Sequence, residues 1–300
     1  MLLGIFMNTG IREAFGEHAY IFIIPYLLSQ LGQGPFIMIS AKDKGLKQHY
    51  SILTIWNLST TPLWIAGAMS EYKLRVILWS TAAFIDLIGL LLAHPAPGGR
   101  RSTENIQFNA EHMLDRYRLF LIIALGEAVF SLIETMIKSP KDYITLLLAI
   151  ASFLTIISMR AMYFWGSDHL IVRRLEETKK PISTAHLTMN SLFIALAGLI
   201  LFSVATRLII EDPSRYNSPL LNGIFFGSLV LYLASQGWYT WYVLKKVPIV
   251  RITFSIILII YGFISINWYS YFSLILVMIL MITLASIIIN LNGNERPEYI

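Results

Sequence analysis

Apolar runs of about 20 residues follow one another along almost the whole chain. A helix of that length crosses the roughly 30 Å hydrocarbon core of a bilayer, whereas apolar runs in soluble cores break after roughly 10–14 residues. The composition agrees, with 56% hydrophobic and only 14% charged residues in a chain of 300. The pattern predicts a polytopic membrane protein and excludes a water-soluble enzyme with one large core.

The runs predict about nine full transmembrane helices. Their ranges are 18–40, 49–69, 74–93, 114–136, 143–166, 184–207, 219–243, 249–267 and 270–290. The apolar opening is only about half a span long before it meets Arg12 and Glu13, so we expect an N-terminal partial helix. Connections of about 2–20 residues leave no room for a soluble domain. The predicted fold is an all-α transmembrane helical bundle in which residues 1–300 form a single integral membrane domain.

Basic residues in the connections alternate between two sides, and the net charge of +5 comes from these connections rather than from a basic face interleaved with aromatic residues. We therefore expect a lipid bilayer and no nucleic acid as partner. One side collects Lys42, Lys44, Lys47, Arg100, Arg101, Arg173, Arg174, Lys179, Lys180, Lys245, Lys246, Arg251 and Arg296. The other collects Arg12, Lys73, Arg75, Lys138, Lys141, Arg207 and Arg215. The positive-inside rule predicts a multi-pass protein of the cell membrane with a cytoplasmic C-terminus.

Aromatic residues gather where two of the predicted spans end. Trp238, Tyr239, Trp241 and Tyr242 lie near the end of one span, and a second group lies at the final hairpin. Such residues fit anchoring at the membrane interface, and core packing explains them nearly as well.

One predicted span carries charges inside it. In residues 115–134, Arg116, Glu127 and Glu134 fall on one helical stripe, joined more loosely by His112 and Ser131. An ionisable group at the bilayer centre costs at least about 2.5–3.5 kcal/mol, so such groups normally face the bundle interior or an aqueous cavity. Glu127 lies about 16 Å beyond Arg116, near mid-bilayer. It either takes and releases protons or locks two helices together.

Asp86 is a second carboxyl group in an apolar span, and its helix directly precedes that of Glu127. Two carboxyl groups on neighbouring helices can share a proton or bind a cation through oxygen. Glu134 has a simpler explanation, because Lys138 follows it by four residues and the two can form an ion pair within one helix.

Four further candidates lie near the predicted cytoplasmic side. We expect Arg160 to reach water or to pair with Asp115, with a substrate contact as the alternative. His112 and His186 can sense pH, although a histidine at a membrane edge is also a common interfacial hydrogen-bonding residue.

Enzyme motifs are absent from the sequence. There is no cysteine, no pair of histidines spaced for zinc on a helix, no phosphate-binding glycine-rich loop and no nucleophile elbow. We therefore expect no catalytic residues, no metal and no cofactor, and we do not expect an enzyme.

The run His112-Met113-Leu114-Asp115-Arg116-Tyr117-Arg118-Leu119-Phe120-Leu121-Ile122-Ile123-Ala124-Leu125-Gly126-Glu127 resembles the bacterial low-temperature-requirement A (LtrA) family, whose pattern is approximately H-x-x-E-R-F-x-L-F-x-I-I-x-L-G-E. Asp115 stands in place of the usual Glu and Tyr117 in place of the usual Phe. The resemblance implies a multi-pass membrane protein and carries no settled activity.

The family usually begins with a helix that carries a W-x-E-L-F-F-D-L-like motif, and this sequence has no such segment. We expect that the N-terminal helix is missing and that the protein is a partial or inactive member if its acids complete a site. The leading functional hypothesis is transport of a small solute or ion with a protonatable intramembrane Glu. The alternative is a non-transporting membrane protein with a stress-related or envelope-assembly role.

Overall fold

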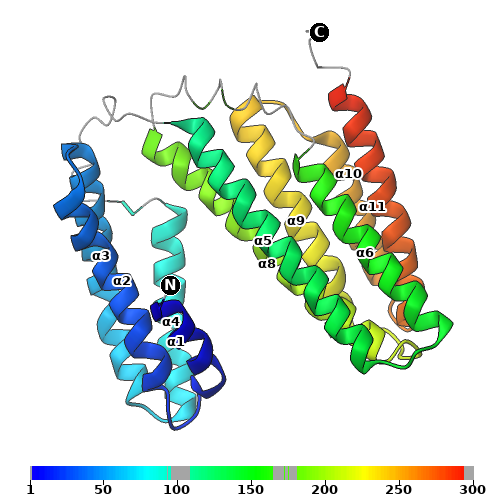
Figure 1. The fold of residues 1–300 in the computed structure, drawn as a ribbon, viewed down its shortest axis with the longest axis horizontal. Helices are drawn as coiled ribbons and strands as arrows, with labels where there is room; N and C mark the ends of the chain where they lie inside the picture. The colour runs from blue at the N-terminus through cyan, green and yellow to red at the C-terminus, as the bar shows by residue number, and fades with distance from the viewer. Residues whose placement is uncertain are drawn as a thin grey trace. The chain divides into compact units, whose positions relative to one another are not determined.

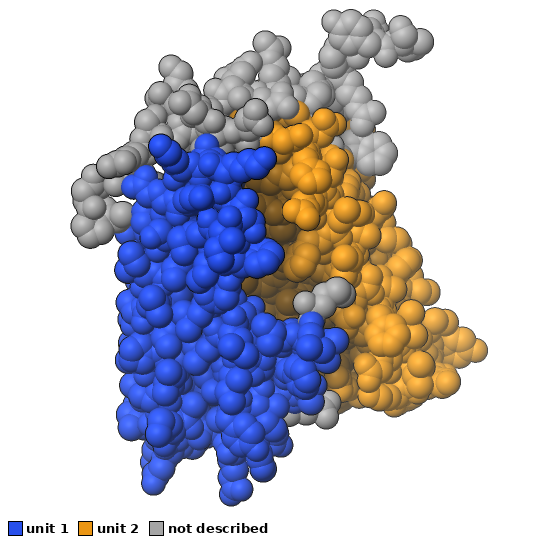
Figure 2. Space-filling view, turned by 60° about the vertical axis from the view of Figure 1, so that its left-hand side comes forward, with its two compact units in different colours: residues 1–108, 179–186 blue, residues 109–178, 187–300 orange. Residues whose placement is uncertain are grey.

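All regular structure in the described residues is helical (Figure 1). The structure is a computed structural model, and it describes residues 2–92, 94–95, 109–164, 172, 175 and 181–293. By their contacts these residues divide into two compact units (Figure 2). The first comprises Met1–Phe108 with Lys179–His186, and the second comprises Asn109–Thr178 with Leu187–Ile300. The prediction of a single membrane domain stays a prediction.

The first unit contains a short helix, a 3-10 turn and three long helices. They are α1 (Leu2–Gly10), η1 (Ile11–Glu13), α2 (Tyr20–Ser40), α3 (Lys44–Ala68) and α4 (Tyr72–Leu91). α3 packs against both α2 and α4. Two short connections join the three long helices, so neighbouring helices run antiparallel. The N-termini of α2 and α4 therefore lie at the same end of the bundle as the C-terminus of α3.

Arg75 stabilises one end of this bundle. Its side chain is buried, with Nε donating to the carbonyl oxygen of Gly67 at 3.1 Å and Nη2 to that of Ser70 at 3.0 Å, while Nη1 donates to that of Gly16. Carbonyl groups at the end of a helix lack partners within the helix and carry partial negative charge, which a cation neutralises. In the sequence alone, Arg75 stands only among the basic residues of the connections. In the structure its hydrogen bonds link α4 to the end of α3 and to the turn after η1.

The second unit contains six long helices. They are α5 (Ala110–Lys138), α6 (Tyr143–Phe164), α8 (Pro181–Glu211, whose first residues belong to the first unit), α9 (Pro219–Leu244), α10 (Ile249–Ile264) and α11 (Ser270–Gly293). α6 packs against α5 and α11, and α9 packs against α10. A hydrogen bond from the Tyr232 hydroxyl to the Met159 carbonyl oxygen, at 2.7 Å, ties α9 to α6 inside the core.

Each of the nine predicted spans falls on one of the described helices. Seven helices are long and apolar enough to cross a membrane, namely α2, α4, α5, α6, α8, α9 and α11. The prediction of an all-α, multi-span membrane fold is confirmed in that form. α10 has only sixteen residues. α3 is not among the seven although it has 25 residues, because polar residues such as Asn57, Thr60 and Thr61 lower its mean hydropathy.

Candidate functional site

Asp86 lies at the centre of a polar cage in the first unit. Its Oδ1 accepts a hydrogen bond from the hydroxyl of Thr60 at 2.8 Å, and its Oδ2 accepts one from Trp64 Nε1 at 3.0 Å. Two longer hydrogen bonds reach Oδ2, from Gln30 Nε2 at 3.3 Å and from the Tyr26 hydroxyl at 3.4 Å. The carboxylate of α4 is therefore held by two side chains of α2 and two of α3. We refer to these five residues as the Asp86 cage.

The Asp86 cage lies well inside the three helices. The N-termini of α2 and α4 and the C-terminus of α3 meet at one end of the bundle, and the cage residues lie roughly 6–21 Å along the helices from that end at 1.5 Å per residue. The middle of a hydrocarbon core about 30 Å thick is about 15 Å from either face. In a bilayer crossed by α2 and α4, the cage would therefore lie within the hydrocarbon core, where water does not solvate a carboxylate freely.

Every hydrogen-bond donor that reaches Asp86 is electrically neutral. Among the described residues, no Lys, Arg or His side chain forms an ion pair with Asp86 or donates a hydrogen bond to it. Neutral donors stabilise a carboxylate without cancelling its charge. The cage is therefore a site with a net negative charge that a proton or another cation can neutralise.

A second layer of amides supports the cage. Asn57 Nδ2 donates to the main-chain carbonyl of Gln30 at 3.0 Å, and the two amide side chains approach to 3.5 Å. The Oε1 atom of Gln30 is buried and has no hydrogen-bond partner. Amide nitrogen and oxygen exchange places by a half-turn of the side chain. Gln30 can thus present either a donor or an acceptor to Asp86.

Sequence reasoning identified Asp86 and missed the four side chains that hold it. A signal was present, because Tyr26 and Gln30 are four residues apart on α2, and Thr60 and Trp64 are four residues apart on α3. Residues with that spacing share a helix face. Which polar faces meet the carboxylate is a matter of tertiary packing.

Glu127 lies on the second unit, and its side chain is exposed on α5. It makes no hydrogen bond or ion pair with a described residue. Arg116 is exposed on the same helix. Beside Glu127, Gly126 and Arg160 line a cavity of about 270 Å³ between α5 and α6. Because Asp86 and Glu127 belong to different units, a proton shared between them stays a prediction.

Asp115 and Arg160 do not pair. Asp115 instead forms an ion pair with Arg118 on its own helix at 2.9 Å, and the Arg160 guanidinium lies 5.5 Å from the ring centre of Phe164. Of the two alternatives expected for Arg160, the structure has the exposed side chain and not the pair with Asp115, because Arg118, three residues from Asp115 on the same helix, pairs with that carboxylate.

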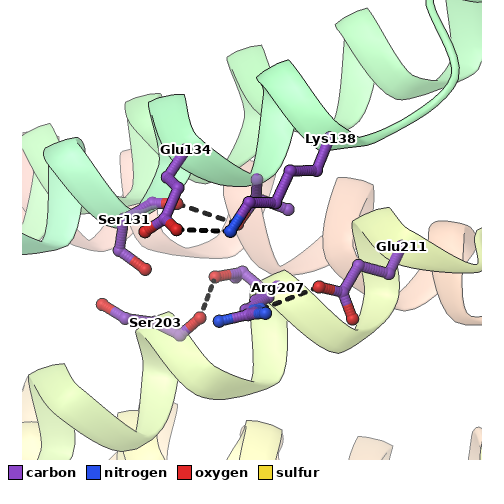
Figure 3. Close-up of polar contacts among 8 residues, drawn as sticks. Ser131, Glu134, Lys138, Ser203, Arg207 and Glu211 are labelled. Atoms are coloured by element: carbon purple, nitrogen blue, oxygen red, sulfur yellow. Dashed lines mark hydrogen bonds and ion pairs between the residues drawn. The ribbon is translucent and has the colours of Figure 1, made fainter.

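Glu134 pairs with Lys138, as the spacing predicted. A second pair of the same spacing, Arg207 with Glu211 at 2.7 Å, lies on α8. Figure 3 shows Glu134 and Lys138 of α5 facing Arg207 of α8, and the charge of Arg207 acts on Glu134. All four side chains are exposed, so the group is a surface charge network rather than a buried site.

His186 meets two other histidines within the first unit. Its Nε2 lies 3.3 Å from Nε2 of His49, and its ring centre lies 5.7 Å from that of His94. One of the two Nε2 atoms must donate and the other accept, which requires different protonation of the two rings. His112 is exposed. In the described part of the chain, no group of three or more His, Asp or Glu residues is arranged to hold a metal ion.

The fold and the seven apolar helices define a multi-span helical membrane protein. A family model described as "Bacterial low temperature requirement A protein (LtrA)" matches residues 1–286, and the chain belongs to this family.

The chain is also similar to an uncharacterized protein of Rhizobium meliloti (strain 1021), with 27% identity over 245 residues. The alignment covers 79% of this chain and 59% of the relative, so the chain spans less than two thirds of that relative's length. No solved structure matches the chain.

Proposed function

We propose that this LtrA-family protein moves a small solute or ion across the cell membrane, and that Asp86 is the group that takes up and releases the coupled proton. The observation that carries the proposal is the Asp86 cage: a carboxylate at membrane depth, held by four neutral donors with no cationic partner among the described residues. A purely structural carboxylate at that depth is normally paired with a cation.

The Asp86 cage can satisfy both protonation states. In the charged state, the carboxylate accepts all four hydrogen bonds. When a proton binds one carboxylate oxygen, that oxygen becomes a donor and needs an acceptor. Gln30 supplies one after its amide turns, because Oε1 has no hydrogen-bond partner to lose. The oxygen atom of Gln30 that is left without a partner in the charged state thus gains one in the protonated state.

Glu127 extends the proposal to the second unit. A carboxyl group on an apolar helix that is unpaired among the described residues is a candidate for a second proton or ion step. We further propose that α3 and α10 cross the membrane too, which makes nine spans, that the C-terminus is cytoplasmic, and that the protein is not an enzyme. The basic residues of the connections support this orientation.

The test has a direct and a functional readout. In infrared difference spectra recorded between high and low pH on the purified protein, the protonated carboxyl absorption of the wild type should contain a component that is missing in Asp86→Asn. In liposomes loaded with a pH-sensitive dye, Asp86→Asn should abolish proton flux. Glu134→Gln, which changes an exposed paired acid, is the matched control for the loss of one carboxylate.

Two results would overturn the proposal. One is an unchanged carboxyl band in Asp86→Asn; the other is wild-type proton flux in that variant. Glu127→Gln tests the second site, because unchanged flux would remove Glu127 from the pathway. The non-transporting alternative predicts instead that both variants lower thermal stability in detergent while no proton flux is present in the wild type.

A further inference from the structure

Arg251 is a half-buried cation that has no hydrogen-bond or ion-pair partner among the described residues. It lies in the first turn of α10, and its Nε atom is buried without a hydrogen-bond partner. Its guanidinium forms no ion pair and donates no hydrogen bond to any residue that the structure describes. Arg75 shows the contrast, because its guanidinium is fully used by carbonyl oxygens. Burial of part of a guanidinium without a partner is costly unless a ligand supplies the counter-charge.

Arg251 lines a pocket of about 450 Å³ between α9 and α10. This volume lies within the range of small-molecule sites. Trp238 and Trp241 form part of its wall, and Ser255 adds a hydroxyl group. Gly237 and Pro248 close one side, where a Cβ on Gly237 would lie 3.3 Å from Pro248 Cγ. The lining contains no Asp or Glu, so nothing in the pocket repels an anion.

The mouth of the pocket is apolar. Four residues that line it are exposed over 46–60% of their surface, namely Trp241, Val247, Ile252 and Ile256. On a helix that crosses a membrane, exposed side chains of this kind face lipid. Next to the mouth, Lys245 Nζ lies 4.6 Å from the ring centre of Tyr242 and adds positive charge. A ligand that enters this way must combine an anionic group with apolar chains.

We propose that the pocket binds the head group of an anionic phospholipid. Arg251 donates its planar fork of N–H groups to the phosphate, a geometry that guanidinium matches better than an ammonium group does. Trp238 and Trp241 hold the head group at the level of the membrane interface, and the acyl chains leave through the apolar mouth. Basic pockets between membrane helices on the cytoplasmic side suit such lipids. The proposal does not depend on transport or on Asp86.

The experiment follows the tryptophan fluorescence of the chain, to which Trp238 and Trp241 in the pocket wall contribute. The purified full chain in neutral detergent micelles is titrated with brominated phosphatidylglycerol or brominated phosphatidylcholine, and quenching of tryptophan fluorescence is followed. The wild type should reach half-maximal quenching at an about tenfold lower fraction of phosphatidylglycerol, since one charge-assisted hydrogen bond is worth about a factor of ten or more. Arg251→Gln should abolish the preference, and Arg251→Lys should keep part of it.

Lys47→Gln is the matched control, because it removes one positive charge from an exposed position on α3 outside the pocket and should keep the preference. Circular dichroism and gel filtration establish that each variant is folded. Equal quenching by the two lipids in the wild type would overturn the proposal, and so would an unchanged preference in Arg251→Gln. If glycerol phosphate added in water prevents quenching by phosphatidylglycerol at equal concentration, the site recognises a soluble anion and the lipid assignment is wrong.

Discussion

Replacement of Thr60 by Val tests whether Asp86 is charged inside the bundle. The Thr60 side chain is completely buried, and its hydroxyl makes the shortest of the four hydrogen bonds to Asp86, at 2.8 Å. Val has nearly the same shape as Thr, so the change removes a donor with little change in packing. The cost of the change therefore reports on the state of the acceptor.

The expected magnitude depends on the charge of Asp86. A hydrogen bond to an ionised group contributes about 1.5–3 kcal/mol, whereas side-chain hydrogen bonds between neutral groups in membrane proteins average about 0.6 kcal/mol. In Asp86→Asn the acceptor is neutral and keeps its shape. Thr60→Val should therefore lower the free energy of unfolding by about 1–2 kcal/mol more in the wild type than in the Asp86→Asn background. This difference is the coupling free energy of the double-mutant cycle.

Reversible unfolding in mixed micelles by titration with a denaturing detergent measures all four proteins of the cycle. The coupling should be present at neutral pH and should fall towards zero when the pH is low enough to protonate Asp86, because the acceptor is then neutral in both backgrounds. Thr61→Val is the matched control: the adjacent hydroxyl donates to the Asn57 carbonyl oxygen at 2.7 Å and not to Asp86. A coupling of zero at every pH would refute a charged, cage-held Asp86.

Two further predictions concern the second unit. Gly198→Ala should lower the free energy of unfolding by about 1–3 kcal/mol, because the added Cβ would lie 2.7 Å from the Ser228 carbonyl oxygen. Gly126→Ala is the control, since no atom lies within 4 Å of its added Cβ, and it should stay within about 1 kcal/mol of the wild type in the same detergent titration. A hydrogen bond to Tyr269 and the charge of Tyr269 raise the pKa of Tyr216 above its ordinary value of 10.0. The protonated Tyr216 hydroxyl thus contributes its full stabilisation below about pH 10, and this stabilisation is lost as the pH rises through the pKa of the folded state. The thermal midpoint of unfolding should therefore fall more steeply above about pH 10 in the wild type than in Tyr216→Phe. Equal slopes in the two proteins would contradict this.

Much of the fold was predictable because bilayer thickness sets the length of a spanning helix. The end of the fourth long helix, α5, was placed within two residues, at 136 against the observed Lys138. The seven helices long and apolar enough to span are all among the nine that the apolar runs predicted. Hydropathy could not reveal the role of α3, because the contacts of Thr60 and Trp64 with the Asp86 carboxylate are made between helices.

The site was predictable only in part. Asp86 stood out since a lone carboxyl group in an apolar run is costly wherever the chain places it. Its partners come from two other helices, 22 to 60 residues away. The close approach of α8 to α9 at Gly198 is likewise a product of packing, since nothing in the sequence separates this glycine from Gly126, which has open space beside it.

The sequence by itself determined that this chain is a helical membrane protein of the LtrA family with a few ionisable residues within its apolar helices. Those properties follow from local composition and from a contiguous motif. Only the tertiary structure decided which charges have partners. Arg75 and Arg251 look alike as basic residues near helix ends, yet packing surrounds one guanidinium with carbonyl oxygens and places the other in the wall of a largely apolar pocket. Hydrogen-bond partners are set by which helix faces meet, and no local pattern contains that information.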